Sequence, residues 1–372
     1  METVKKNLRV LPIHIMNPRD DEEKALLIGE EFESLIQTLG GVVVDRLMQK
    51  IAFPDRHTFI GKGKIGEIIH LVKEKEIDVV ILNAAVKPGQ VHNIKVELEK
   101  SLLKTEVWDR VDLILHIFEK HANTTEAKLQ IDLARMRYMG PRIYGMGHIM
   151  SNQGGGIGTR GIGETNTELM KRHWRDQMKS VTDQLDKISK SRKQQLEQRK
   201  RAGFRTVSIV GYTNAGKSSL FNLLTKKNVL AENALFATLD SSVGKLYLPE
   251  LQQEVLLTDT IGFIRDLPPK LIDAFKSTLM ESLHADVLLH VVDASDVEVE
   301  EKMKVVEKVL GELGRGTEDV VYVFNKADKL EGSRKAEVAD RYKELQPVFV
   351  SVKEEKGVPE LLAAITSLLK TH

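Results

Sequence analysis

Residues 211–218 read Gly-Tyr-Thr-Asn-Ala-Gly-Lys-Ser, the phosphate-loop pattern G-x-x-x-x-G-K-[ST]. The loop follows the apolar run 207–210, and a helical pattern begins directly after it. Glycines let successive backbone N–H groups surround phosphates, Lys217 reaches the outer phosphates, and the Ser218 hydroxyl faces a magnesium ion. The pattern therefore predicts a site for a nucleoside triphosphate with Mg²⁺. A glycine turn before an ordinary helix is the plainer alternative for this motif alone.

A second motif, Asn325-Lys326-Ala327-Asp328, selects the base. Guanine presents N1–H and an exocyclic amine, so a carboxylate at Asp328 accepts both hydrogen bonds, whereas adenine would leave that carboxylate unpaired. Lys326 lays its stem on the purine face. Ser351-Val352-Lys353 corresponds to a last guanine-contacting loop that acts through a backbone N–H. Either motif alone is also compatible with a charged surface turn, but their order after the phosphate loop predicts GTP/GDP as the ligand.

The magnesium side of the site is predicted from a D-x-x-G segment. Asp259 ends an apolar strand pattern, and the segment closes at Gly262. We expect Asp259 to hold the metal through water and the N–H of Gly262 to sense the γ-phosphate. Thr238 is the predicted switch hydroxyl on magnesium, with Ser241 and Ser242 as the alternatives.

The residue after Gly262 is Phe263, where Ras-like enzymes place a glutamine that orients the attacking water. An apolar ring neither accepts a proton nor positions water by hydrogen bonding. We therefore predict slow hydrolysis by the isolated chain, with the missing group or ordering supplied by a partner. The alternative is that Phe263 only packs beneath the second switch and another residue positions the water.

These motifs define the complete set of predicted site residues. The residues expected to contact the nucleotide are Gly211, Tyr212, Thr213, Asn214, Ala215, Gly216, Lys217, Ser218, Ser219, Phe236, Asp259, Thr260, Ile261, Gly262, Asn325, Lys326, Asp328, Ser351, Val352 and Lys353. The predicted metal ligands are Ser218, Thr238 and Asp259. The residues assigned to hydrolysis are Lys217, Thr238, Gly262 and Phe263.

Composition limits the class of protein. With 372 residues, 41% hydrophobic and 29% charged, the chain is typical of a soluble protein of two or three domains. No apolar run approaches the roughly 20 residues that span a bilayer, and the N-terminus lacks an apolar signal core, so we expect a cytoplasmic monomer without integral membrane association. The absence of cysteine excludes disulfides and thiolate metal sites.

The first predicted domain, residues 1–123, alternates strand and helix patterns, which favours a small α/β domain with a parallel sheet. The predicted strands are Leu8–Ile15, Val42–Leu47, Ile77–Leu82 and Thr105–Trp108, and the predicted helices are Glu22–Leu39, Ile65–Lys75 and Val91–Leu103. Residues 61–66 match the dinucleotide pattern G-x-G-x-x-G, but the strand before them is short and does not open a βαβ unit. We favour a glycine turn into a helix over a nucleotide site.

Residues 124–203 show no strand pattern and predict a long antiparallel helical hairpin. Its helices are expected at Thr125–Tyr138 and Glu164–Arg201, with a glycine-rich loop over 139–164. The second helix carries a coiled-coil seam, expected to be packing residues: Trp174, Met178, Val181, Leu185 and Ile188. Residues 171–205 hold twelve basic and four acidic side chains, against a net charge of +1 for the whole chain.

The third predicted domain, residues 204–372, again alternates strands and helices and closes with a helix at Pro359–Leu369. The expected architecture is a doubly wound P-loop GTPase sheet with its ligand at the carboxyl ends of the strands. The predicted strands are Val207–Val210, Gly244–Leu248, Val255–Leu257, Val287–Val292, Val320–Phe324 and Val348–Val350.

Together, the order of domains and the motifs resemble the HflX family of ribosome-associated GTPases, on the Era and Obg side of the translation-factor class. The resemblance covers nearly all of the chain. It rests on the GTPase motifs, the glycine-rich segment 155–165, the Asp259–Phe263 segment, and Asp109-Arg110 with the apolar run 113–118. Two segments depart from the family: 145–150 is poorer in arginine, and Ser241-Ser242 replaces the usual Pro-Thr.

The resemblance implies that the chain binds the large ribosomal subunit in the GTP state, dissociates stalled or idle ribosomes, and acts in stress recovery. A basic hairpin agrees in kind, because phosphate contacts dominate RNA affinity. Scarce aromatic residues argue against sequence-specific RNA recognition. A solvated coiled-coil face is the plainer explanation of the charge. Two other functions stay open: a GTPase of ribosome assembly, and a nucleotide- or RNA-binding module with a regulatory GTPase domain.

Overall fold

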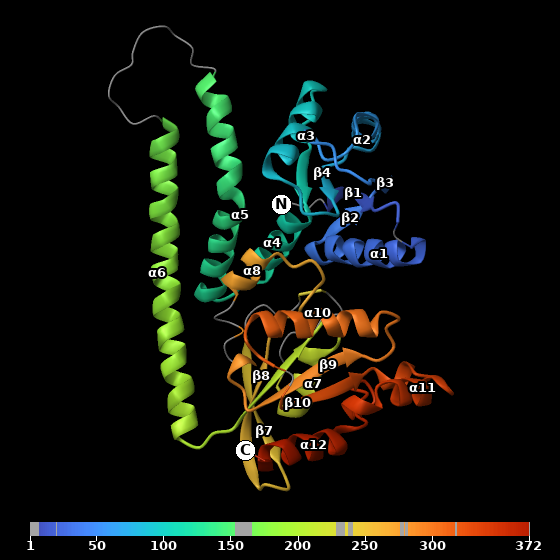
Figure 1. Ribbon diagram of the computed structural model, residues 1–372, viewed down its shortest axis with the longest axis vertical. Coiled ribbons are helices and arrows are strands. Elements are labelled where there is room, and N and C mark those ends of the chain that lie inside the picture. Colours follow the sequence, from blue (N-terminus) through green and yellow to red (C-terminus); the bar gives the residue numbers. More distant parts are fainter. Residues whose placement is uncertain are drawn as a thin grey trace, which may run out of the picture. The chain divides into compact units, whose positions relative to one another are not determined.

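The structure, a computed structural model, describes residues 7–19, 21–152, 166–227, 235–236, 241–275, 279, 282–316 and 318–371. The chain separates into two compact units, Met1–Lys120 with Ile131–Asp183 and His121–Gln130 with Gln184–His372. Each unit contains one sheet, and the two long helices contribute to both (Figure 1). The predicted α/β class is confirmed, whereas the three predicted domain ranges stay predictions. Within the described ranges, no helix has the length and apolar character needed to cross a membrane.

The first unit holds a five-stranded sheet in the order β2-β1-β4-β5, with β3 also paired to β1, and every pairing is parallel. Its strands are β1 (Leu8–Met16), β2 (Gly41–Val43), β3 (Leu47–Lys50), β4 (Val79–Leu82) and β5 (Glu106–Asp109). The connecting helices are α1 (Glu22–Leu39), α2 (Lys62–Lys75) and α3 (Pro88–Lys100). A further helix that the patterns did not predict, α4 (Arg110–His121), begins directly after β5.

The predicted strand Val42–Leu47 is wrong, because β2 and β3 take its place. Between these two pairings, residues 11–12 of β1 face residues 44–46, which belong to neither β2 nor β3. This break lies opposite Pro12, which has no N–H to donate to a neighbouring strand.

The glycine pattern at residues 61–66 is a turn into a helix, as predicted. Gly61 is the N-cap of α2, and Gly63 and Gly66 lie within that helix. A Cβ added at Gly63 or Gly66 would meet nothing within 4 Å, so neither glycine serves a close backbone approach in this structure.

Two long helices, α5 (Thr125–Asn152) and α6 (Asn166–Arg201), form the hairpin. The predicted helix end at Tyr138 is wrong, and so is the first part of the loop expected over 139–164, because α5 continues to Asn152. The glycine-rich stretch 154–163 lies outside the described residues.

Helix α5 continues through Gly140 and Pro141, a pair that usually ends a helix. A Cβ on Gly140 would lie 3.2 Å from Trp174 Nε1, so the glycine lets α6 approach closely. Arg192 of α6 forms an ion pair with Glu126 of α5 at 3.2 Å. Because the earlier residue of α5 contacts the later residue of α6, the two helices are antiparallel, as predicted. The predicted seam is a part-buried to buried face of α6: Trp174, Met178, Val181, Leu185 and Ile188.

The second unit holds a six-stranded sheet in the order β11-β10-β9-β6-β8-β7, parallel except for the β7–β8 pair. Its strands are β6 (Thr206–Gly211), β7 (Ser242–Leu248), β8 (Gln253–Asp259), β9 (Val287–Asp293), β10 (Val320–Asn325) and β11 (Val348–Phe349). Its helices are α7 (Lys217–Thr225), α8 (Pro269–Ala274), α10 (Val299–Glu312), α11 (Arg334–Arg341) and α12 (Val358–Thr371). All six predicted strands are present.

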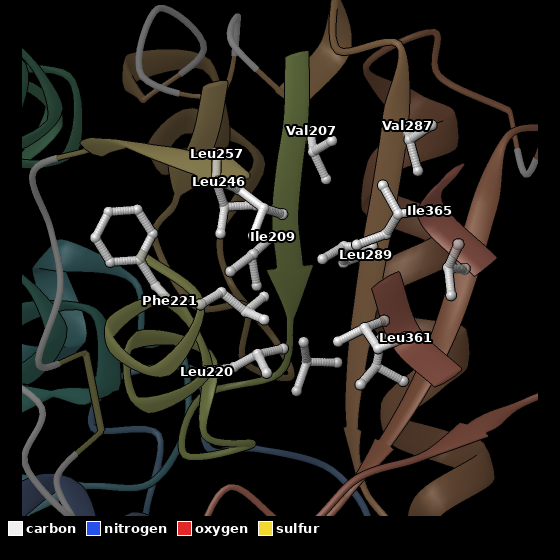
Figure 2. Packing of buried hydrophobic residues seen from close by; sticks show 14 of the residues in the cluster. Val207, Ile209, Leu220, Phe221, Leu246, Leu257, Val287, Leu289, Leu361 and Ile365 are labelled. Atoms are coloured by element: carbon white, nitrogen blue, oxygen red, sulfur yellow. The ribbon is translucent and has the colours of Figure 1, made fainter. Parts of the chain in front are cut away.

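Both faces of this sheet are covered, as alternation along β10 demonstrates. Val321 and Val323 pack in the cluster that contains α7 and α12, part of which Figure 2 shows around β6. Tyr322 and Phe324, on the opposite face, pack in a second cluster with Met303 of α10. The carboxyl ends of the parallel strands are thereby held at one edge, where the predicted motifs lie.

Candidate nucleotide-binding site

The phosphate loop connects the end of β6 to the start of α7. A Cβ added at Gly211 would lie 2.3 Å from the carbonyl oxygen of Val291 in β9. Gly216, the N-cap of α7, has a φ of 92°, and its Cβ would lie 2.2 Å from Asn325 Nδ2. Both positions require glycine, because a side chain would collide with the neighbouring strands or their loops.

Lys217 is buried at the base of this loop, where 6% of its surface is exposed. Its Nζ donates a hydrogen bond to the carbonyl oxygen of Tyr212 at 2.8 Å. Burial lowers the pKa of Lys217 to about 8, an effect that the charge of Asp259 partly offsets. Anionic phosphates in the loop would stabilise the protonated lysine further.

Ser218 and Asp259 are brought together on the magnesium side. Ser218 Oγ, in the first turn of α7, donates to Asp259 Oδ2 at 2.6 Å. Asp259 ends β8 and is fully buried. A hydroxyl and a carboxylate are oxygen ligands of the kind that Mg²⁺ prefers, and they lie beside the loop that would hold its phosphates. The donor set therefore fits this ion.

Backbone hydrogen bonds join the phosphate loop to the D-x-x-G segment. Thr213 N donates to the Phe263 carbonyl at 2.7 Å, and Phe263 N donates to the Gly211 carbonyl at 3.1 Å. A Cβ on Gly262 would lie 2.8 Å from Thr213 Cγ2 and 2.9 Å from Lys217 Nζ. Gly262 therefore packs directly on the loop, next to the lysine.

The Phe263 ring is buried, with 1% of the residue exposed. Its backbone hydrogen-bonds to the phosphate loop. The following residues are tied down as well, because Arg265 N donates to the Tyr212 hydroxyl at 2.8 Å and the Arg265 guanidinium forms an ion pair with Glu298 at the start of α10. The Phe263 side chain therefore offers no atom that could accept a proton from the attacking water.

The N-K-x-D motif braces the phosphate loop from the neighbouring strand. Asn325 Nδ2 donates to the Ala215 carbonyl at 2.9 Å, and Lys326 Nζ donates to the Asn214 carbonyl at 2.9 Å. Lys326 also forms an ion pair with Asp293 at 2.7 Å. Asp293 ends β9 at the same sheet edge and was not among the predicted site residues. Its position directly after an apolar run is the pattern that could have predicted it.

Asp328 is held for base recognition by the last loop. Ser351 Oγ donates to Asp328 Oδ1 at 2.6 Å, and this bond keeps the pKa of Asp328 below its usual value. Val352 N donates to Asn325 Oδ1 at 3.3 Å. The two guanine motifs therefore form one hydrogen-bonded unit with an ionised carboxylate.

The switch residues are placed only in part. Thr238, the predicted magnesium hydroxyl, lies outside the described residues. Phe236 is 2% exposed. Of the alternatives, Ser242 begins β7, and Ser241 Oγ accepts a hydrogen bond from Arg192 of α6 at 3.2 Å, a contact that no sequence pattern indicated.

The remaining predicted residues lie within or directly after the motifs described above. Thr260 Oγ1 donates to the Ile209 carbonyl at 2.7 Å, and Ile261 is buried. Ser219 lies in α7, and Lys353 is exposed after Val352.

Three family descriptions match consecutive parts of the chain. Residues 28–119 match the N-terminal region of a GTP-binding GTPase, and residues 121–199 match the middle region of the same proteins. Residues 206–326 match the family described as 50S ribosome-binding GTPase.

Solved structures and curated relatives agree with these matches. A crystal structure of SsGBP with GDP aligns with a TM-score of 0.53 and 27% identity, covering 98% of this chain and 99% of that one. A GTP-binding protein from Sulfolobus solfataricus in complex with GDP shares the fold, with a TM-score of 0.50 and 24% identity over 98% of this chain and 99% of that one. GTPase HflX of Caldanaerobacter subterraneus is 41% identical, over 98% of this chain and 81% of the relative. GTPase HflX of Escherichia coli is 38% identical, over 96% of this chain and 82% of the relative. The chain therefore belongs to the HflX family of GTPases.

Proposed function

We propose that the chain is a GTP-hydrolysing switch that binds the large ribosomal subunit in its GTP state and dissociates stalled or idle ribosomes. One observation carries the nucleotide part of this proposal. The phosphate loop, Asn325 and the Asp328–Ser351 pair form a continuous hydrogen-bonded frame along one sheet edge. A triphosphate and a guanine are recognised at the two ends of that frame.

Guanine selection is assigned to Asp328. Its carboxylate keeps one oxygen bonded to Ser351, and a carboxylate still has acceptor capacity for two N–H groups of a purine. Adenine has no N1–H and would leave the carboxylate desolvated without a partner, which disfavours ATP.

Magnesium would be held by Ser218 and, through water, by Asp259, with Thr238 as the proposed switch ligand. The ion would neutralise charge on the phosphates during transfer. Lys217 would bind the same phosphates. Gly262, which packs against the phosphate loop beside Lys217, would contact the γ-phosphate through its N–H.

Slow hydrolysis by the isolated chain follows from Phe263, whose buried ring cannot orient water. We assign the missing group or ordering to the partner. The match of residues 206–326 to the description 50S ribosome-binding GTPase supports the large subunit as that partner. Dissociation of ribosomes in stress recovery rests on the resemblance to HflX proteins.

Sedimentation in sucrose gradients tests the proposal. Purified ribosomes and separated subunits are incubated with the chain and GTP, GDP or a non-hydrolysable GTP analogue, with Lys217→Ala as the control that cannot hold the phosphates. We expect co-sedimentation with large subunits only in the triphosphate state, together with loss of intact ribosomes. Binding that does not depend on the nucleotide contradicts the proposal, and binding only to precursor particles would indicate an assembly GTPase instead.

A further inference from the structure

We propose that the second half of α6 is a contact surface for the phosphate backbone of RNA. This inference rests on the proposed ribosome-binding function and adds the part of the hairpin that meets the RNA. The surface, called the basic half-helix below, consists of Lys187, Lys190, Lys193, Lys200 and Arg201.

The charge of the hairpin is not spread along α6. Residues 187–201 hold seven basic side chains and one acidic side chain, a net charge of +6. Residues 166–186 of the same helix hold four of each, a net charge of zero. The positive charge therefore lies in the half of α6 that belongs to the compact unit of the nucleotide site, away from the glycine-rich end of the hairpin.

The five cations are exposed and have no ion-pair partner among the residues that the structure describes. Lys187, Lys190 and Lys193 each have a carboxylate four residues away on the helix, at Asp183, Asp186 and Glu197 respectively, yet none of these pairs closes to 4.0 Å. On α10 the same spacing does produce a pair, between Lys304 and Glu300 at 2.6 Å. The charges of the basic half-helix are thus available to an external anion.

Helix stability alone does not account for this charge. Cations favour the last turn of a helix because they interact with its dipole, and this explains Arg199, Lys200 and Arg201. The effect falls off within that turn, so it does not extend to Lys193, Lys190 or Lys187. Three neighbouring unpaired lysines repel one another, which is a cost that an anionic ligand would remove.

The rest of the surface indicates which anion. Between the lysines, the exposed residues are Ser191, Gln194, Gln195, Glu197 and Gln198, of which only Glu197 is negatively charged, and the apolar Ile188 and Leu196 lie on the less exposed side. Hydroxyl and amide groups contact phosphate and sugar oxygens, and no exposed aromatic ring is present to stack on a base. The surface is about 21 Å long at 1.5 Å per residue, enough to follow several phosphates of a strand. It therefore fits an RNA backbone, read without regard to sequence.

The opposite side of the same half-helix touches the nucleotide unit. Arg192 bonds both Glu126 and Ser241, and Ser241 borders the predicted first switch. RNA bound to the basic half-helix would thereby sit on the helix that contacts this switch border.

The salt dependence of binding tests the inference. The full chain, loaded with a non-hydrolysable GTP analogue, is co-sedimented with purified large subunits and separately with protein-free ribosomal RNA, from roughly 50 to 200 mM salt. The test variant is Lys187→Gln/Lys190→Gln/Lys193→Gln. The matched control, Arg172→Gln/Arg175→Gln/Lys179→Gln, removes the same charge from exposed positions in the other half of α6. GDP binding by every variant serves as the check of folding, because these positions lie outside the nucleotide site.

We expect the test variant to bind both targets about tenfold or more weakly and to lose about 2 from the slope of log affinity against log salt, while the control changes little. An equal loss of affinity in both variants would overturn the inference, because binding would then depend on the net charge of α6 and not on the position of the lysines. Wild-type affinity of the test variant would overturn it too. A loss seen with subunits but not with protein-free RNA would assign the surface to a ribosomal protein. If the wild-type chain itself binds no subunit, the proposed function fails instead.

Discussion

Lys217 is expected to make nucleotide affinity depend on pH in the mildly alkaline range. Burial lowers its pKa to about 8 in the nucleotide-free chain. Bound phosphates compensate the charge and return this pKa toward its ordinary value, so binding is coupled to proton uptake. Affinity for GDP therefore falls as the pH rises through the lower pKa.

The size of this effect follows from the titration of one group. With a pKa of about 8, Lys217 is about nine-tenths protonated near pH 7 and about one-quarter protonated near pH 8.5, which predicts about fourfold weaker binding. His290, which lies near Lys217, does not contribute, because burial lowers its pKa to about 3.

The same shift acts on stability with a definite sign. Between pH 8 and 10.5 the unfolded chain binds more protons at Lys217 than the folded chain does, so the free energy of unfolding rises with pH in that window. The buried ammonium costs roughly 3 kcal/mol below it. Nucleotide-free protein should therefore gain thermal stability toward pH 10, while its affinity for GDP declines.

Isothermal titration of GDP in magnesium-free buffer at the two pH values measures the effect on binding. Lys217→Arg is the matched control, because a guanidinium stays protonated throughout. A wild-type affinity that changes less than twofold would refute this account of Lys217. An equal decline in the Lys217→Arg variant would assign the pH dependence to another group.

Three further outcomes are expected. Asp328→Asn should lower affinity for GDP at least tenfold relative to xanthosine diphosphate, because an amide cannot accept both N–H groups of guanine; unchanged base preference in competition binding would contradict this. Gly216→Ala should lose GDP binding, since its Cβ would lie 2.2 Å from Asn325 Nδ2, and a thermal melt separates lost binding from lost folding. Phe263→Gln should not accelerate hydrolysis and should destabilise the chain by about 2 kcal/mol, because it buries an amide in an apolar site; a faster single-turnover rate would count against the buried placement.

Much of the second unit was predictable because its strands are apolar runs that end in motif residues. Val320–Asn325 illustrates this, since burial on both faces makes the run continuous and the asparagine follows at the sheet edge. The order of the motifs also predicts that Asp259 and Ser218 share the magnesium side of the site, and the two side chains are hydrogen-bonded. In these strands, the residues that favour local strand structure are also the residues that the buried sheet and the site require.

Prediction was poorer where tertiary packing outweighs local preference. Gly140-Pro141 signals a helix end, yet contact with Trp174 accompanies a helix that continues. The break between β2 and β3, opposite Pro12, depends on pairing with β1 and could not be predicted from residues 44–46 alone. Contacts between side chains far apart in sequence, such as Arg192 with Ser241, are likewise invisible to spacing rules.

In the proposed switch, GTP hydrolysis depends on the large ribosomal subunit. The experiment that measures this dependence is steady-state release of phosphate from GTP, with the chain alone and with increasing concentrations of purified large subunits. We expect slow turnover by the chain alone and a saturable increase of about 10-fold or more with subunits. A rate that large subunits leave unchanged, or one that is already fast without them, would contradict it.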